Sequence, residues 1–84
     1  MALFTTFIVV PFDHGTGGKL HPGVPRRLRA HANAMAMADD LAPFHAGVIV
    51  LRDRDDPAAG IFLEPRLVCA IGDVPRDLLV QLAA

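Results

Sequence analysis

Residues 46–71 read AGVIVLRDRDDPAAGIFLEPRLVCAI, two apolar runs that flank an acidic segment containing proline and glycine. Both runs are rich in β-branched and aliphatic side chains, which favour strands. The first strand is expected over residues 46–52. The second is expected to start at Leu63 or at Leu67 and to end at Ile71. Pro65 lacks a backbone N–H, so we expect it at the start of the second strand or at a bulge. The whole segment predicts a β-hairpin with a charged tip at residues 53–60.

Residues 3–10 predict another strand, which ends at Pro11. A long glycine-rich loop follows, from Asp13 to Val24. Pro25 then fits the first turn of a helix, and residues 26–42 contain no glycine or proline but many alanine and methionine residues. We therefore expect the main helix over residues 26–42, ending before Pro43.

The C-terminal segment predicts a short second helix. Gly72 and Asp73 end the preceding strand, and Leu78, Leu79 and Leu82 supply an apolar helix face. Residues 1–84 are therefore expected to form a single α+β domain with the order β-α-β-β-α. Its sheet has three strands and is mainly antiparallel, and the main helix packs on one face. The last strand is placed in the centre, where both of its pairings are antiparallel.

The strands are apolar on both faces. In the first strand Phe4 and Ile8 point one way, whereas Phe7 and Val9 point the other way. One helix covers only one face, and 52% of the residues are hydrophobic. We therefore predict a homodimer, formed either by packing sheet to sheet or by pairing edge strands. The alternative is that the C-terminal helix covers the second face within one chain.

Composition narrows the class of protein. A net charge of −1 and an acidic hairpin tip disfavour a nucleic-acid partner. The apolar N-terminal segment, residues 2–12, is shorter than the about 20 residues that span a membrane, so no membrane association is expected and a cytoplasmic protein is predicted. The single Cys69 has no partner for an internal disulfide and is interpreted as a small buried hydrophobe. No cofactor is expected.

One cluster of positive charge stands near the start of the predicted helix. It consists of Lys19, Arg26, Arg27 and Arg29. Cations oppose the helix dipole at that end, and free amides there attract anions. The cluster is thus a candidate anion site for a phosphate or carboxylate group. The alternative is that these arginines pair with aspartates elsewhere or remain solvated.

A weaker metal hypothesis rests on Asp13, His14 and His21, which provide two imidazoles and one carboxylate in the same loop. Their spacing matches no established ligand motif, and loop residues of these types are commonly solvated or capping groups. The adjoining residues 15–19 lack the glycine and the hydroxyl that a phosphate loop requires. The chain has no serine, and we assign no catalytic residue.

The Ala-rich segment, the sequence HAGVIV at residues 45–50, the turn ending at Gly60 and the terminal GDVP at residues 72–75 together resemble a group of small bacterial proteins of similar length. That resemblance implies a β-α-β-β order and no assigned activity. The predicted function is a small non-enzymatic interaction or regulatory module that acts as a homodimer and contacts another protein. The alternative is an anion- or metabolite-binding dimer, with or without catalysis, that uses the loop from Asp13 to Val24 and the helix start.

Overall fold

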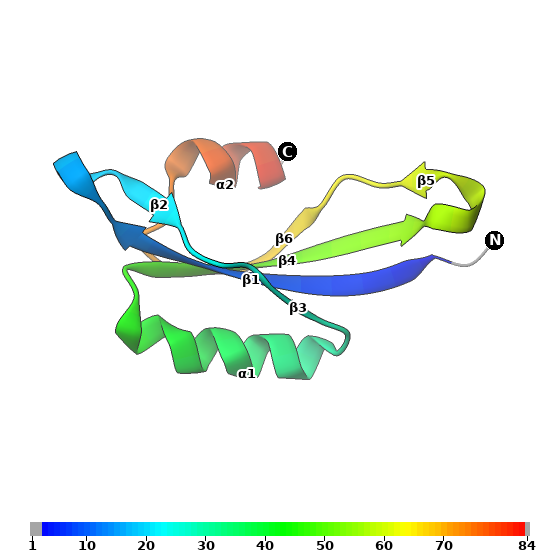
Figure 1. Cartoon of the computed structure of the whole chain (residues 1–84), viewed down its shortest axis with the longest axis horizontal. Coiled ribbons are helices and arrows are strands. Elements are labelled where there is room, and N and C mark those ends of the chain that lie inside the picture. Colours follow the sequence, from blue (N-terminus) through cyan, green and yellow to red (C-terminus); the bar gives the residue numbers. More distant parts are fainter. Residues whose placement is uncertain (1–2, 84) are drawn as a thin grey trace.

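The computed structural model describes residues 3–83; Met1, Ala2 and Ala84 of the predicted domain lie outside the described residues. Six strands form one antiparallel sheet, with α1 on one face and α2 on the other (Figure 1). The strands are β1 (Phe4–His14), β2 (Leu20–Pro22), β3 (Arg26–Leu28), β4 (Gly47–Asp56), β5 (Ile61–Phe62) and β6 (Arg66–Gly72). The helices are α1 (His31–Leu41) and α2 (Arg76–Ala83). The α+β class is confirmed, whereas the expected count of three strands is too low.

The centre of the sheet is β1 paired with β4, and β6 lies at an edge. The predicted central position of the last strand is therefore wrong. After β1 the chain turns back along the outer side of that strand as β2 and then β3, until Leu28 lies opposite Phe7. Helix α1 consequently starts beside Phe7, three residues after β1 begins. Its return path brings β4 in antiparallel to β1, a pairing that the sequence-based topology did not consider.

The predicted loop from Asp13 to Val24 is mostly a hairpin. Gly17 and Gly18 adopt φ values of 78° and 77°, which glycine reaches without steric cost, and they let β1 turn directly into β2. Strand β1 also continues through Pro11. The Pro11 carbonyl accepts from Gly23 N–H at 2.7 Å on the outer side of β1. The Pro11 nitrogen faces the same side, in the gap between β2 and β3. The absence of an N–H there therefore costs no hydrogen bond of the β1–β4 ladder.

Helix α1 begins at His31 rather than Arg26. The helix-forming tendency of residues 26–30 is overridden because Leu28 packs on the core while its backbone pairs with Phe7. The predicted end of the helix is confirmed, since α1 stops at Leu41 and a 3-10 turn containing Pro43 follows. The short C-terminal helix is confirmed as α2.

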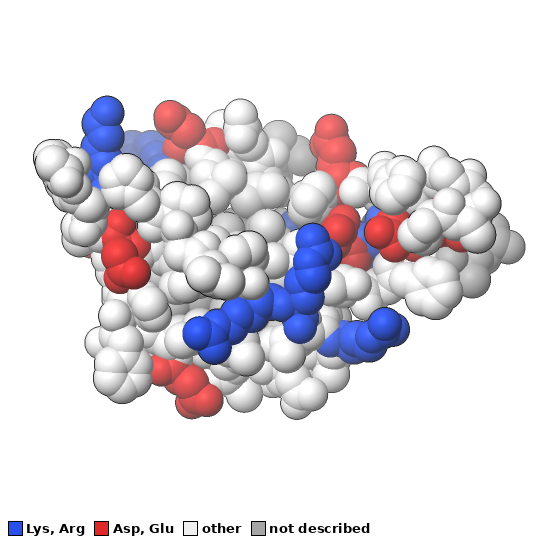
Figure 2. Space-filling model, in the orientation of Figure 1, with Lys and Arg blue, Asp and Glu red and all other residues white. Residues whose placement is uncertain are grey.

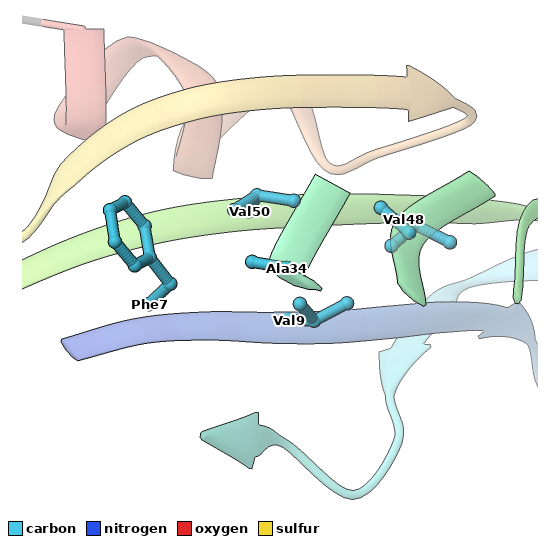
Figure 3. Packing of buried hydrophobic residues seen from close by; sticks show 6 residues of the cluster. Phe7, Val9, Ala34, Val48 and Val50 are labelled. Atoms are coloured by element: carbon cyan, nitrogen blue, oxygen red, sulfur yellow. The ribbon is translucent and has the colours of Figure 1, made fainter. Parts of the chain in front are cut away.

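The main core lies between α1 and the sheet. Phe7, Val9, Val48 and Val50 project from β1 and β4 toward Ala34 of the helix, as Figure 3 shows. The opposite face carries Phe12 and Ile49, which are 3% and 1% exposed, on the side where α2 lies. This face is therefore covered in part within one chain.

The sheet extends past α1 as a projection that we call the arm, formed by residues 4–6 and 53–62 (Figure 1). The described fold measures 45 × 25 × 19 Å and has a radius of gyration of 13.5 Å, against about 11.9 Å for an ordinary 84-residue domain. The tip of the arm is the turn Pro57–Ala59 with Gly60, so the predicted charged tip is wrong. The aspartates stand in β4, and Asp56 is buried, where its carboxylate accepts from Ala59 N–H. Within residues 3–83, neither helix has the length and apolar character needed to cross a membrane.

Candidate interaction surface

The three residues predicted to hold a metal ion do not converge. Asp13 lies opposite His21 in the β1–β2 register, so these two side chains share one face. His14 is the next residue of β1 and projects from the other face, because successive side chains of a strand alternate. The described part of the chain contains no group of three or more potential metal ligands. The three side chains are thus not brought together as a facial site requires.

Asp13 and His14, at the end of β1, instead contact two different loops, one before β4 and one after β6. His45 Nδ1, before β4, lies 2.9 Å from Asp13 Oδ2, and His14 Nε2 lies 3.5 Å from Asp73 Oδ2, after β6. The Asp13, His14 and Asp73 side chains are more than half exposed, so each contact contributes at most about 1 kcal/mol. These pairs are therefore weak local contacts between the end of β1 and the neighbouring loops.

A cleft of about 610 Å³ lies beside the His14–Asp73 pair, between the β1–β2 hairpin and the start of α2. Its polar lining comes from His14 and the cation Lys19 on one side and from the carboxylates of Asp73 and Asp77 on the other. Because charges of both signs line it, the cleft does not favour an anion. Lys19 therefore has carboxylate neighbours that the sequence-based cluster did not include.

The structure separates Lys19 from the three arginines of the predicted cationic cluster. Lys19 lies opposite Gly15, just past the end of β1, whereas Arg26 lies opposite Val9. Gly15 and Val9 are six residues apart along an extended strand, so Lys19 and Arg26 are about 20 Å apart. Arg26 and Arg27 belong to β3 and point to opposite faces, and Arg29 follows that strand. Figure 2 shows basic side chains gathered where β3 crosses the front of the molecule, apart from another at the hairpin end. Of the four residues only Arg29 lies next to α1, immediately before the N-cap Ala30, so the helix-start argument applies to Arg29 alone.

Sequence reasoning missed a different basic cluster, formed by Arg52, Arg54 and Arg66. Arg52 lies opposite Phe7 on the α1 side of the sheet, and Arg66 lies opposite Arg52 in β6. Arg54 is two residues along β4 and shares that face. The strict alternation of arginine and aspartate over residues 52–55 was the available signal, since it segregates the two charges onto opposite faces of a strand.

The outer edge of β6 is open, because within residues 3–83 that strand pairs only with β4. Asp73 N–H donates to the Ala46 carbonyl at 2.9 Å, which makes these residues a hydrogen-bonded pair. Bonded and non-bonded pairs alternate along an antiparallel ladder, so the backbone groups of Cys69 and Ile71 point toward β4. The N–H and C=O of Ala70 therefore point outward.

The two edges of the sheet differ in chemistry. The β2–β3 edge carries Pro22, Pro25, Arg26 and Arg27, and proline and charge on an edge oppose pairing with another strand. The β6 edge carries the uncharged run LVCAI at residues 67–71. Its one irregularity is a register shift opposite Val50 and Leu51, which leaves regular pairing over the last four residues. Within the described residues, the β6 edge therefore offers a longer uncharged run for pairing than the two-residue edge strand β5.

Apolar side chains beside that edge are incompletely covered. Leu78, Leu79 and Leu82 of α2 are only partly buried, Val80 is 64% exposed, and Val68 of β6 is 37% exposed. A second exposed group lies on the arm, where Phe4 and Phe62 are both opposite Asp55 and so share one face.

The total surface agrees with incomplete coverage. The accessible surface is 5554 Å², whereas a folded 9.0 kDa monomer exposes about 4,850 Å². The excess, about 700 Å², is close to the about 800 Å² that each partner buries in a standard protein interface.

The chain matches no protein-family model, no curated protein and no solved structure.

Proposed function

We propose that this protein is a small non-enzymatic interaction module that acts as a homodimer, with β6 of one copy paired antiparallel to β6 of the other. The observation that carries the proposal is the contrast between an open apolar edge at β6 and an opposite edge protected by proline and arginine. A two-fold axis makes such pairing self-complementary, because the same strand supplies both sides.

The outward backbone groups of Ala70 give this pairing its register. In an antiparallel pair related by two-fold symmetry, these groups can bond the partner strand without any change in the β4–β6 ladder. The partly buried leucines of α2 lie on an element that contacts β6, so a second copy at that edge would reduce their exposure. The surface excess of about 700 Å² is of the size that this contact needs.

Light scattering coupled to gel filtration tests the proposal at micromolar concentration. We expect twice the 9.0 kDa chain mass for the unaltered protein and the chain mass for Ala70→Lys, because the substitution places like charges across the new strand pair. Ala70→Pro, which removes the outward donor, should act in the same direction. Val24→Lys adds the same charge at a 77% exposed position beside the protected edge and should remain dimeric.

The arm is the competing location for an interface, and Phe62→Lys tests it. If Phe62→Lys dissociates the dimer while both Ala70 variants remain dimeric, the β6 assignment is wrong. A mass of 9.0 kDa for the unaltered chain would refute the homodimer itself. Circular dichroism of every variant establishes that a change of mass reflects association and not unfolding.

A further inference from the structure

We infer that the cluster of Arg52, Arg54 and Arg66, together with the start of α1, is a binding site for the phosphate group of a small phosphorylated ligand. This site is on the α1 side of the sheet; Arg52 and Arg54 belong to β4, and Arg66 is the first residue of β6, four positions before Ala70. It also differs from the sequence-predicted set of Lys19, Arg26, Arg27 and Arg29, in which the fold separates Lys19 from the arginines of β3.

The register brings the three arginines close together. Directly opposite residues of antiparallel strands have Cβ atoms about 4.5–5.5 Å apart, so Arg52 and Arg66 are immediate neighbours. Arg54 is two residues from Arg52, or about 7 Å along the same face. Like charges in such positions repel each other unless an anion lies between them.

Carboxylates do not neutralise this cluster. Asp53 and Asp55 project from the opposite face of β4 because they alternate with the arginines. Asp56 shares the arginine face, but it is 6% exposed and its carboxylate accepts from Ala59 N–H. In the described part of the chain, the only acid–base contacts within 4.0 Å are the two histidine–aspartate pairs at the other end of the sheet.

Arg52 supplies a donor that lacks an acceptor. Its Nε atom is buried and makes no hydrogen bond within the described residues. A buried donor without a partner is costly, and a guanidinium donor is satisfied best by a charged oxygen. The two forked guanidinium groups of Arg52 and Arg66 match the several oxygens of a phosphate.

The start of α1 adds a second source of positive potential. The His31 ring packs edge-on against Phe7 at 5.4 Å between centroids, and Phe7 lies directly opposite Arg52. This end of the helix points toward the arm (Figure 1), carries no capping side chain and has no acidic residue in its first turn. Free amides and the helix dipole at such an end attract the same anion as the arginines do.

Phosphate is favoured over a carboxylate because three arginines and a helix end provide more donors and more charge than one carboxylate group can accept. The ligand class is therefore a small phosphomonoester, for which inorganic phosphate is the simplest probe. A polynucleotide would need a continuous basic track, whereas Asp53 and Asp55 line the other side of the same strand.

The test is titration of the full chain with inorganic phosphate, followed by NMR of the arginine Nε–H groups and by calorimetry. We expect phosphate to shift the Arg52 Nε–H signal, and we expect Arg52→Gln and the exposed Arg66→Gln each to weaken binding about tenfold or more, which is about 1.4 kcal/mol. Arg27→Gln and Arg76→Gln remove the same charge elsewhere and should leave the affinity unchanged.

Three results would overturn this assignment. The first is no phosphate binding, and the second is equal weakening by all four substitutions, which would indicate a response to net charge alone. The third is acetate or a short oligonucleotide binding as tightly as phosphate through Arg52 and Arg66, which would identify a different ligand class. Because Arg66 is exposed, its variant keeps the test decisive if Arg52→Gln unfolds. Light scattering on the same samples separates this result from the dimer: Arg52 belongs to β4, so Arg52→Gln should weaken phosphate binding without any change of mass, and a change of mass in Arg66→Gln would report on β6 pairing.

Discussion

Gly47→Ala is expected to destabilise the protein by displacing the connection between β6 and α2. Gly47 is buried at the start of β4, between Phe12 of β1 and Gly72 of β6. An added Cβ would overlap the carbonyl oxygen of Asp73 and lie 2.6 Å from its carbon. These are backbone atoms, and Asp73 N–H is bonded to the Ala46 carbonyl at 2.9 Å, so the connection cannot move without loss of that hydrogen bond.

The expected loss follows from these contacts. Overpacking of a tight site costs about 1–3 kcal/mol, and the hydrogen bond contributes about 1 kcal/mol. The smaller entropy of the unfolded alanine chain offsets about 0.4–1 kcal/mol. The free energy of unfolding should therefore fall by about 2–3 kcal/mol, and the melting temperature of a domain this size by about 10–20 °C.

Urea unfolding followed by circular dichroism measures this loss, and Gly60→Ala is the matched control. Gly60 has a φ of 69° with no atom near the added Cβ, so alanine there carries only the left-handed backbone cost of about 1–2 kcal/mol. Amide exchange in α2 should rise in Gly47→Ala and remain unchanged in Gly60→Ala. A Gly47→Ala protein as stable as the parent, with unchanged exchange in α2, would refute the steric argument.

Two further substitutions test the core and the arm. Val50→Ala removes a fully buried side chain between α1 and the sheet and should lower the free energy of unfolding by about 2–3 kcal/mol in urea titration, whereas Val80→Ala, at a 64% exposed position, should change it by less than about 0.5 kcal/mol. Asp56→Ala removes the carboxylate that accepts from Ala59 N–H and should cost about 1 kcal/mol by thermal unfolding; an equal loss in Asp55→Ala would contradict this capping role.

The sequence predicted the elements whose local signals and tertiary contacts agree. The hydrophobic hairpin strands, the end of α1 before Pro43 and the short α2 fall in this class. It missed β3, because residues 26–28 favour a helix locally while the pairing of Leu28 with Phe7 favours a strand. That pairing joins residues 21 positions apart in the chain, and local propensity carries no information about it.

The candidate sites show the same limit. Lys19 and Arg26 are close in sequence, but a hairpin and an edge strand place them about 20 Å apart. Arg52 and Arg66 are distant in sequence, and the β4–β6 register makes them neighbours. The alternation at residues 52–55 did indicate that Arg52 and Arg54 share a face, because a strand with that pattern has one basic and one acidic face whatever its partner. It did not indicate that Arg66 joins them.

The unequal edges also determine where assembly would stop. A strand edge that pairs with a different edge can repeat without limit, which leads to fibres. Pairing of β6 with the same strand of a second copy would consume the open edge of both chains at once. Apart from the two-residue strand β5 of the arm, the edges then left outermost are those of β2 and β3, which carry Pro22, Pro25, Arg26 and Arg27. On this reasoning the arginines of β3 act by preventing further strand addition, so replacing Arg26 and Arg27 with apolar residues should convert a closed dimer into larger assemblies.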